Sequence, residues 1–503
     1  MSIRFVQLAG KTENNLLDSR IRLTAYAGIL GFLVLGLVAI SKQPFESGGD
    51  EGFHLMRALL VTKGFSLYDQ IWSDQPPIFT ALLAAVFEIT GPSATAARCV
   101  VLLMACLLLL AHFEIGFSLI GGFASLFGVA SLAISAHFVD LALCAMLPLP
   151  AMSLGLLGVL AWFEFRHSGS KWCLASSGIL MGFAIQTKLS ALILLPALAF
   201  QALVSAKHKC GGQSPKKAVE KCAIWFGAIC ATLGVILIMY PGVSWDAIWQ
   251  SHSDASFSGV FAPPLRLWEM LRQHGDVSLF AVAAATRIFV RRHWQCGFFL
   301  ILLASALSVH SVQRPFYSYY YLHIALPLCW LFGYAVNEAI TMARSLRIGA
   351  SNRVATSEYL VVIVLAGLLG IYLARLPERL HCVAASFTPR ESRVERHIVS
   401  LLAERRARTT WVYTDSPIFA FHARLLVPPE LAVVSPKRIR TGRITVDKLI
   451  LWLEKYRPEQ IVLRSHKLGG HALTALLDRN YRLIFEENSI RYYVANELFE
   501  TDE

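Results

Sequence analysis

Between two apolar runs near the N-terminus the sequence reads Gly48-Gly49-Asp50-Glu51-Gly52-Phe53-His54-Leu55-Met56-Arg57. A short polar stretch follows, and the next apolar run opens on Trp72-Ser73-Asp74-Gln75-Pro76-Pro77. The acidic pair lies between two membrane spans, and it is followed by an amphipathic segment and by a Pro-Pro pair where the second span begins. This arrangement indicates a polar site held against a lipid surface. We therefore predict that residues 41–77 form the first outer loop of a membrane protein.

The composition is that of a polytopic α-helical membrane protein. Of 503 residues, 55% are hydrophobic and 16% are charged, and the mean hydropathy is +0.53. Because a membrane helix needs about 20 apolar residues in a row, the apolar runs of residues 1–376 predict about 11 to 13 spans. The runs begin near Ala25, Ile78, Cys99, Gly121, Leu141, Trp172, Leu189, Cys222, Val277, Trp294, Leu322 and Glu358.

Two parts of this span pattern are unusual. The first run, Ala25 to Ile40, has no small-residue cleavage site before Phe45, so we expect an uncleaved first helix. If every apolar block between Arg98 and Arg166 crossed the membrane, the number of crossings would not fit the sides assigned to the flanking loops. We expect one of these blocks to be re-entrant or broken.

The net charge of +12 does not indicate nucleic acid as a partner, because much of it lies in short loops between spans. The positive-inside rule places such loops in the cytoplasm. They carry Lys207, Lys209, Lys216, Lys217 and Lys221, then Arg287, Arg291 and Arg292, then Arg344, Arg347 and Arg353. On this placement the chain is a multi-pass protein of the inner (plasma) membrane with a cytoplasmic N-terminus. Loop 41–77, residues 242–273 and 314–321 and the C-terminal part then lie on the extracytoplasmic (periplasmic) side.

The long apolar runs stop near Leu376, and residues 377–503 are predicted to form a small soluble α/β domain. Helical periodicity and short apolar stretches alternate along it. The predicted helices are 393–407, 446–456 and 471–478, and the predicted strands are 411–414, 460–463, 481–485 and 490–494. This alternation is typical of a small layered fold, here outside the membrane.

The first outer loop carries the strongest chemical candidates. If the segment after Gly49 is helical, Asp50, His54 and Arg57 project from one face while Glu51 turns aside. A carboxylate at the outer surface can act as general base for an acceptor hydroxyl. The alternative is a helix cap, because Asp and Glu also favour the positive end of the helix dipole.

Lys188 interrupts the apolar segment from Ile179 to Phe200, where a lysine is costly unless it pairs or reaches the surface. It is either a cation for a phosphate at the membrane surface or a snorkelling lysine at a span end. Arg314 and the tyrosine-rich residues 317–321, followed by His323, open another span at the same face. Tyrosines at that depth also form aromatic belts, so both interpretations stay open.

Two further residues have alternative interpretations. His252 precedes Pro263-Pro264 in an outer loop and is either a metal ligand or part of a solvated loop. Asp140 is either a functional acid within the membrane or an interfacial turn residue. The cofactor that His252 would allow is a divalent metal cation.

Taken together, these features resemble the polyprenyl-phosphate-dependent GT-C glycosyltransferases. This superfamily includes protein O-mannosyltransferases, lipid A aminoarabinose transferase and the rhizobial lipid A galacturonosyltransferases. The residues that carry the resemblance are Asp50-Glu51, Gly64, Tyr68, Asp74-Gln75-Pro76-Pro77, Thr187-Lys188 and residues 315–327, and more loosely residues 413–417 and Val427-Pro428-Pro429.

The resemblance implies an inverting transferase. It would move a monosaccharide from a polyprenyl-phosphate donor to a lipid (lipid A or lipopolysaccharide), glycan or protein acceptor outside the cytoplasm. Asp50 would be the general base, and Glu51 would position the acceptor or a divalent cation. The departing polyprenyl phosphate would be stabilised by Lys188, Arg57 and Arg314. Supporting roles would fall to His54, Tyr68, Asp74, Gln75, Asp140, Tyr320 and His323.

Two positions depart from the family pattern. Many relatives carry a lysine where this chain has Gln75, and an acid within the segment matching residues 146–150, which leaves Asp140 as a substitute. The competing class is a transporter or flippase for a lipid-linked or anionic substrate, which has little need for an outer acidic pair. A non-enzymatic membrane scaffold would explain the composition but none of the outer-face pattern.

The basic loops generate a test of orientation. A reporter fused after Lys217 should report the cytoplasm, and one fused after Arg393 the extracytoplasmic side, because basic loops resist translocation. Activity of paired phosphatase and fluorescent-protein fusions measures both. A cytoplasmic signal from the Arg393 fusion would separate the C-terminal domain from the outer loop and overturn the assignment.

Overall fold

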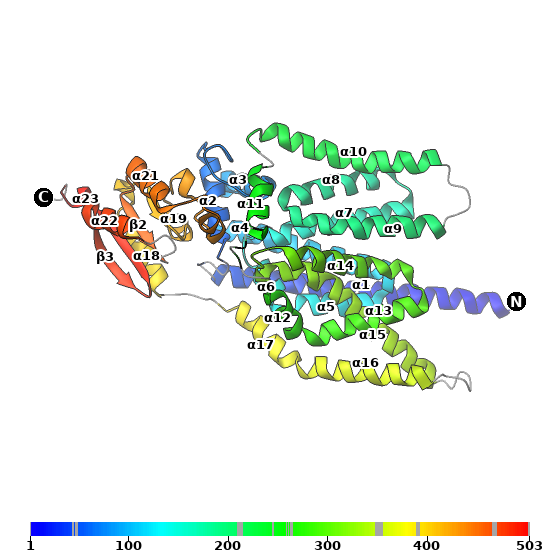
Figure 1. Cartoon of the computed structure of the whole chain (residues 1–503). Coiled ribbons are helices and arrows are strands. Elements are labelled where there is room, and N and C mark those ends of the chain that lie inside the picture. The colour runs from blue at the N-terminus through cyan, green and yellow to red at the C-terminus, as the bar shows by residue number, and fades with distance from the viewer. Residues whose placement is uncertain are drawn as a thin grey trace.

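A computed structural model describes residues 2–500 except 43–44, 46–48, 209–214, 244–245, 258, 260, 262–264, 348–355, 389–392 and 465–469. Five residues used above, namely Gly48, Lys209, Pro263, Pro264 and Arg353, lie outside the described residues. The described chain forms a long helical bundle with a small domain containing a β-sheet at one end (Figure 1). The N-terminus lies at the other end of the bundle (Figure 1).

The helices of the membrane part follow one another with short connections. Those of the first half are α1 (Ser2–Lys42), α2 (Glu51–Thr62), α3 (Ile78–Thr90), α4 (Ala94–Ile120), α5 (Gly122–Ala133), α6 (Ala136–Ala142), α7 (Pro148–Ser168), α8 (Lys171–Thr187), η1 (Leu189–Ile193) and α9 (Leu194–His208). Those of the second half are α10 (Pro215–Met239), the π-helix η2 (Asp246–Gln250), α11 (Ser251–Phe257), α12 (Leu265–Gln273), α13 (Gly275–Arg291), η3 (Trp294–Cys296), α14 (Gly297–Val312), η4 (Ser318–Tyr320), α15 (Tyr321–Arg347), α16 (Thr356–Ala374) and α17 (Leu376–Ser386).

Seven of the described helices are long and apolar enough to cross a membrane, or eight if one bent pair counts as a span. This count is below the 11 to 13 spans predicted. The runs that start near Ile78 and Leu189 form shorter apolar helices, Ile78–Thr90 and Leu189–Val204. Apolar length in the sequence therefore overcounts full spans, because helix breaks and short helices also occur in this bundle.

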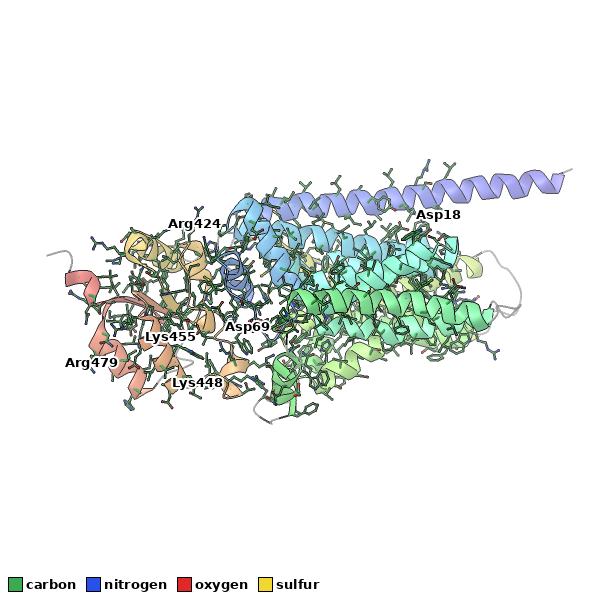
Figure 2. All side chains as sticks on the ribbon, turned by 90° about the horizontal axis from the view of Figure 1, so that it is seen from above. Asp18, Asp69, Arg424, Lys448, Lys455 and Arg479 are labelled. Carbon is green, nitrogen blue, oxygen red and sulfur yellow. The ribbon has the colours of Figure 1, made fainter. Side chains whose placement is uncertain are left out.

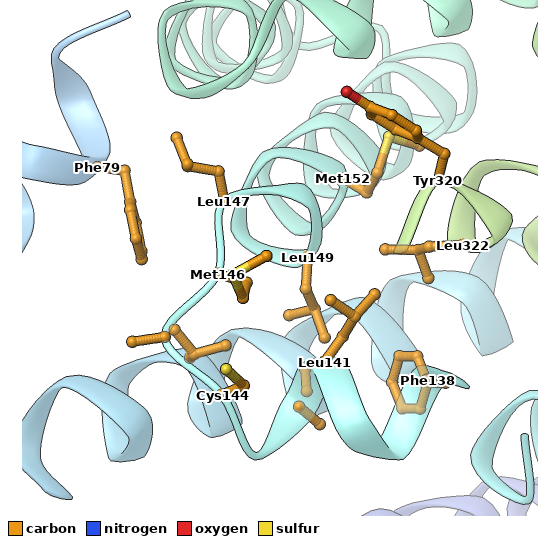
Figure 3. Packing of buried hydrophobic residues seen from close by; sticks show 14 of the residues in the cluster. Phe79, Phe138, Leu141, Cys144, Met146, Leu147, Leu149, Met152, Tyr320 and Leu322 are labelled. Carbon is orange, nitrogen blue, oxygen red and sulfur yellow. The ribbon is translucent and has the colours of Figure 1, made fainter. Parts of the chain in front are cut away.

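The bent pair is α5 and α6, which meet at an angle of 70°. It is the broken segment expected between Arg98 and Arg166. After α6 the chain runs without helix through residues 143–147 before α7 begins. Figure 3 shows Met146, Leu149 and Leu141 together in the apolar core around this connection, with Tyr320 and Leu322 nearby. The non-helical residues 143–147 thus lie between the apolar core and the first outer loop, where the Ala145 N–H donates to Glu51.

Close helix packing in the bundle depends on small residues. A Cβ on Gly333 of α15 would lie 2.0 Å from the carbonyl oxygen of Ala124 on α5, which no side chain permits. Small residues at such crossings let helix backbones approach in a membrane, where apolar lipid gives little drive for helix association. This contact fixes the middle of α15 against α5.

The C-terminal domain contains a four-stranded sheet in the order β1-β2-β4-β3. Strands β1 and β2 are parallel, while β2 with β4 and β3 with β4 are antiparallel. The strands are β1 (Val412–Thr414), β2 (Gln460–Leu463), β3 (Tyr481–Glu487) and β4 (Ile490–Ala495). The helices are α18 (Arg393–Glu404), η5 (Arg406–Arg408), α19 (Ile418–His422), η6 (Pro429–Leu431), α20 (Pro436–Arg440), α21 (Val446–Tyr456), α22 (His471–Asn480) and α23 (Glu497–Glu500). The predicted α/β character and each predicted strand and helix are confirmed.

The helix α17 begins at the predicted domain boundary but packs against the membrane part. Its Arg379 donates to both carboxylate oxygens of Asp276 on α13, at 2.6 and 2.5 Å. The separately packed C-terminal unit therefore begins at α18. Its α19 lies against α2, where a Cβ on Gly52 would come within 2.7 Å of the Ile418 nitrogen. Figure 2 shows Asp69 of the outer loop at the junction of the domain and the bundle.

A buried ion pair holds α2 onto α4. The Arg98 guanidinium donates to Glu51 Oε1 at 2.8 Å and to Oε2 at 2.7 Å, and it also donates to the Phe45 carbonyl at 2.8 Å. The two side chains are 1% and 0% exposed. Glu51 Oε1 also accepts the Ala145 N–H at 2.8 Å, which ties in the α6–α7 connection. One carboxylate thus joins three separate segments.

We expect Glu51→Gln to destabilise the protein by about 3 to 5 kcal/mol, because it leaves the Arg98 charge buried and unpaired. Thermal unfolding of the purified chain in detergent measures this. The double variant Glu51→Gln with Arg98→Met should recover part of the loss. Glu220→Gln, which breaks the exposed Lys171–Glu220 pair, is the control and should cost about 1 kcal/mol or less. Equal losses from both single variants would contradict the anchoring role.

Candidate active site

A cavity of about 70 Å³ lies where the outer loop, the bundle and the C-terminal domain meet. Six separate parts of the chain line it: the outer loop with the start of α2, the α6–α7 connection, Lys188, His252 of α11, residues 313–320, and residues 433–437 at α20. Its polar lining residues are Asp50, His54, Arg57, Asp74, Gln75, Lys188, His252, Gln313, Arg314, Tyr317, Tyr319, Tyr320, Ser435 and Lys437. The sequence candidates of the outer loop, Lys188 and Arg314 therefore share one site.

Asp50 is positioned by the start of α2. It occupies the N-cap position, yet its side chain makes no capping hydrogen bond. Asp50 thus lies at the positive end of the helix dipole, as the cap interpretation expects, but its side chain lines the cavity and does not cap the helix through a hydrogen bond. Burial raises the pKa of Asp50, and this effect outweighs the opposing influence of Lys188 and Arg57. A carboxylate with a raised pKa is a better proton acceptor at neutral pH.

Asp74, the second carboxylate of the cavity, behaves in the opposite way. Burial alone would raise the pKa of Asp74, but an ion pair with Lys437 and the nearby His252 lower it below its ordinary range. Asp74 thus stays ionised while Asp50 is tuned towards proton transfer. Two carboxylates whose environments drive their pKa values apart are a common basis for different acid and base roles.

Arg57 connects the two halves of the outer loop. It donates to Ser73 Oγ at 2.8 Å and to His54 Nδ1 at 2.5 Å, and Ser73 Oγ donates to the Gln75 carbonyl at 3.0 Å. Burial first, then the Arg57 charge, lowers the pKa of His54 well below its ordinary value, so this imidazole is neutral. Among the described residues, Arg57 Nε and Arg314 Nε are buried donors without a hydrogen-bond partner. Both arginines line the cavity and keep donors for an anion.

Lys188 enters the cavity from the break between α8 and η1. Its backbone is extended there, with φ −157° and ψ 130°, and the residue is 6% exposed. The ammonium lies 5.1 and 5.2 Å from the ring centroids of Tyr319 and Tyr320, which is cation–π distance. The snorkelling interpretation does not describe this lysine, because its charge is held inside the protein. The tyrosines line the cavity and are more than an outer aromatic belt.

The C-terminal domain contributes Lys437, which the sequence analysis missed. Its ammonium pairs with the Asp74 carboxylate and lies 3.3 Å from His252 Nδ1. His252 Nε2 lies 3.2 Å from the Asp74 carbonyl oxygen and 3.5 Å from Gln75 Nε2. Ser435 accepts the Arg438 N–H and so caps the short helix that carries Lys437. A Ser-Pro helix start is readable in the sequence, but the direction in which this helix faces depends on domain docking.

Four predicted site residues do not line the cavity. The Tyr68 hydroxyl donates to the Gln75 carbonyl at 2.8 Å, and this hydrogen bond holds together two parts of the outer loop. His323 is buried in the bundle, with its Nδ1 2.8 Å from His310 Nε2 and its Nε2 3.3 Å from Ser190 Oγ. Asp140 is on α6, away from the lining. The catalytic role predicted for Glu51 needs correction, since its carboxylate is engaged by Arg98 and the Ala145 N–H.

The residues suggested as metal ligands do not fit that role. Glu51 faces α4, and His252 is held by Lys437 and the Asp74 carbonyl. Within the part of the chain that the structure describes, no three His, Cys, Asp or Glu side chains lie close enough together to hold a metal ion.

Residues 74–240 match the family model described as dolichyl-phosphate-mannose-protein mannosyltransferase. These residues include the outer-loop segment from Asp74 and Lys188. A search of curated protein sequences gave no match.

Three solved structures share the architecture. ArnT from Cupriavidus metallidurans, bound to undecaprenyl phosphate, has a TM-score of 0.62 and 14% identity, over 94% of this chain and 98% of that chain. The apo oligosaccharyltransferase of Archaeoglobus fulgidus has a TM-score of 0.56 and 13% identity, over 86% of this chain and 69% of that chain. Its complex with an inhibitory peptide and a dolichol-phosphate has a TM-score of 0.50 and 13% identity, over 87% of this chain and 69% of that chain. The resemblance inferred from the motifs is confirmed: the chain is a multi-pass membrane protein with the fold of the GT-C glycosyltransferase superfamily.

Proposed function

We propose that this protein is an integral membrane glycosyltransferase that moves a monosaccharide from a polyprenyl-phosphate donor to an acceptor on the extracytoplasmic side, with inversion. The acceptor class is a lipid such as lipid A, another glycan or a protein. The observation that carries the proposal is one cavity that joins the Asp50 carboxylate to buried cations from three parts of the chain. The family match and the lipid phosphates named with the structural neighbours support the donor class.

The proposed reaction uses Asp50 as the base. The acceptor O–H gives its proton to the Asp50 carboxylate as the acceptor oxygen forms a bond to the anomeric carbon. The bond between that carbon and the phosphate oxygen breaks, and its electron pair stays on the phosphate. Lys188, Arg57 and Arg314 are placed to stabilise this growing charge, and such preorganised donors act strongly in a site that excludes water. Attack from the side opposite the phosphate inverts the configuration.

Lys437 supplies a cation next to Gln75, the position where relatives carry a lysine. In this chain the charge reaches the cavity from the C-terminal domain, through the ion pair with Asp74. We propose that Lys437 positions Asp74 and the outer loop and adds positive potential at the donor phosphate. This role would make the C-terminal domain part of the reaction site.

The proposed orientation puts the cavity and the C-terminal domain on the extracytoplasmic side of the inner membrane. Both lie at one end of the bundle, whereas the end of α15 and the start of α16, like the end of α9 and the start of α10, lie at the other (Figure 1). The in-cell test of function is mass spectrometry of envelope glycolipids and glycoproteins with and without the gene, which should reveal one glycan modification that depends on the chain.

Asp50→Asn should lower turnover by about 10² to 10⁴, the usual cost of losing a general base. The purified protein should still insert and bind its lipid donor. Since burial raises the pKa of Asp50, kcat/KM should fall with decreasing pH at a value above the ordinary pKa of about 4 for aspartate. A radiolabelled sugar-transfer assay measures both effects. Asp69→Asn, an exposed aspartate of the same loop, is the control, and near-normal turnover by Asp50→Asn would remove Asp50 from the base role.

Lys188→Met should lower turnover by a factor of about 10² or more, because negative charge grows on the phosphate as the bond breaks. The loss of turnover should be at least as large as the loss of donor affinity in the same variant. Lys171→Met, at the exposed start of the same helix, should have little effect. Liposomes with a radiolabelled polyprenyl-phosphate sugar and acceptors separate transfer from transport. Donor that crosses the bilayer with no product and no dependence on Asp50 would favour the transporter.

Lys437→Met should weaken turnover by about tenfold or more, because it leaves the Asp74 carboxylate buried without its cation. Arg440→Met changes an exposed arginine on the same helix and should leave kinetics unchanged. Steady-state kinetics of both variants, with thermal unfolding to check folding, is the measurement. Kinetics of Lys437→Met that match the unchanged protein would show that the C-terminal domain is not part of the site.

A further inference from the structure

A second cavity, of about 380 Å³, lies beside α13, α17 and the α5–α6 bend. It is much larger than the reaction cavity of about 70 Å³, and ligand pockets usually measure about 300 to 1,000 Å³. The start of α15 separates the two, because Tyr320 lines the reaction cavity and Tyr321 lines the second one. The second cavity is therefore a neighbouring but distinct compartment.

One side of this cavity carries hydrogen-bond donors with spare capacity. Arg379 is engaged by the buried Asp276 carboxylate at 2.6 and 2.5 Å. Arg375 makes long ion pairs, 3.7 Å to Asp276 and 3.8 Å to the exposed Glu378, which also lines the cavity. The Ser135 hydroxyl is shielded from solvent and has no hydrogen-bond partner among the described residues. A buried hydroxyl of this kind is rarely left unpaired, so a polar ligand atom beside it is the simplest partner.

Three rings form an adjoining wall. The His274 ring stacks on Tyr321, with centroids 4.6 Å apart and planes at 21°. His137 meets both rings edge-on, at 5.7 Å from His274 and 5.5 Å from Tyr321. Imidazole and phenol groups can donate to anionic oxygens. With Arg375 and Ser135, this wall favours an acceptor-rich anion such as a phosphate.

The remaining wall is apolar, and Val277, Ala325, Leu328 and Cys329 line it. The helix α16 ends at Ala374, directly before Arg375, and Leu373 on that helix is 53% exposed. The apolar segment Tyr359–Ser386, which includes Arg375 and α17, is one of the candidate membrane spans. An occupant must therefore match an apolar interior and a polar rim with two arginines, Arg375 and Arg379, and one carboxylate, Glu378. A lipid with a phosphate in its head group has both features.

We propose that this second cavity binds the phosphate-bearing head group of a membrane lipid from the leaflet on the side of the reaction site. The phosphate contacts Arg375, Ser135 and the histidine wall, and the first part of the lipid chain lies against Val277 and Leu328. This inference needs only the membrane protein and its cavity, so it stands or falls independently of the transferase activity.

Cys382 gives a readout inside the cavity. It is an exposed free cysteine that lines the cavity, whereas Cys222 is exposed near the start of α10 and lies outside it. The purified full chain in detergent is labelled with a maleimide, with dioleoyl phosphatidate or dioleoylglycerol added, and labelling of each cysteine is followed by peptide mass spectrometry. Phosphatidate should slow labelling of Cys382 several-fold and leave Cys222 unchanged, while dioleoylglycerol should protect neither.

Variants locate the phosphate. Arg375→Gln should weaken protection by about fivefold or more, the worth of one charge-assisted hydrogen bond. Arg344→Gln, an exposed arginine at the other end of α15, should not weaken it, and nor should Lys188→Met in the reaction cavity. Equal protection by dioleoylglycerol, unchanged protection in Arg375→Gln, or loss of protection in Lys188→Met would each overturn the proposal.

A second series identifies the lipid. Undecaprenyl phosphate and phosphatidate carry the same phosphate chemistry on an isoprenoid and on a diacyl chain. Whichever protects Cys382 at the lower concentration is the better fit to the apolar wall, and protection by either supports the site. Thermal unfolding of each variant shows that a loss of protection is not a loss of folding. Absence of protection by both lipids would also overturn the proposal.

Discussion

The buried ion pair between Glu51 and Arg98 is the constraint on which the site depends. It fixes the rotation of α2 about its axis, because a carboxylate with two arginine bonds and one backbone N–H has little freedom to move. With Glu51 turned to α4, the neighbouring helix face with Asp50, His54 and Arg57 points into the cavity. A charged pair without solvent is costly to break, so this orientation is held firmly.

A second set of polar contacts closes the site from outside the membrane. Lys437 reaches Asp74 and His252, and Arg443 bonds Asp254 on the same outer helix at 3.1 Å. These contacts join the C-terminal domain to two outer loops that are distant in sequence. The same contacts lower the pKa of Asp74 and leave Asp50 as the carboxylate suited to accept a proton. Docking of the C-terminal domain and the difference in pKa between the two carboxylates therefore have a common physical origin.

The two cavities on either side of Tyr320 and Tyr321 differ in kind. The reaction cavity is small, lined by carboxylates and cations, and bordered by the C-terminal domain. The second is larger, mainly apolar and bordered by α17. The bend between α5 and α6 serves both, since α6 borders the second cavity and the connection after it borders the first. One break in the bundle thus contributes to the walls of two cavities.

The sequence by itself determined the membrane class, the α/β C-terminal domain and the common face of Asp50, His54 and Arg57. These follow from composition and from periodicity, which depend only on nearby residues. Only the tertiary structure decided that Glu51 anchors α2 and that Lys437 enters the cavity. It also showed that some apolar runs are short or broken helices. Ion pairs between distant segments depend on how helices and domains dock, and local spacing carries no information about that.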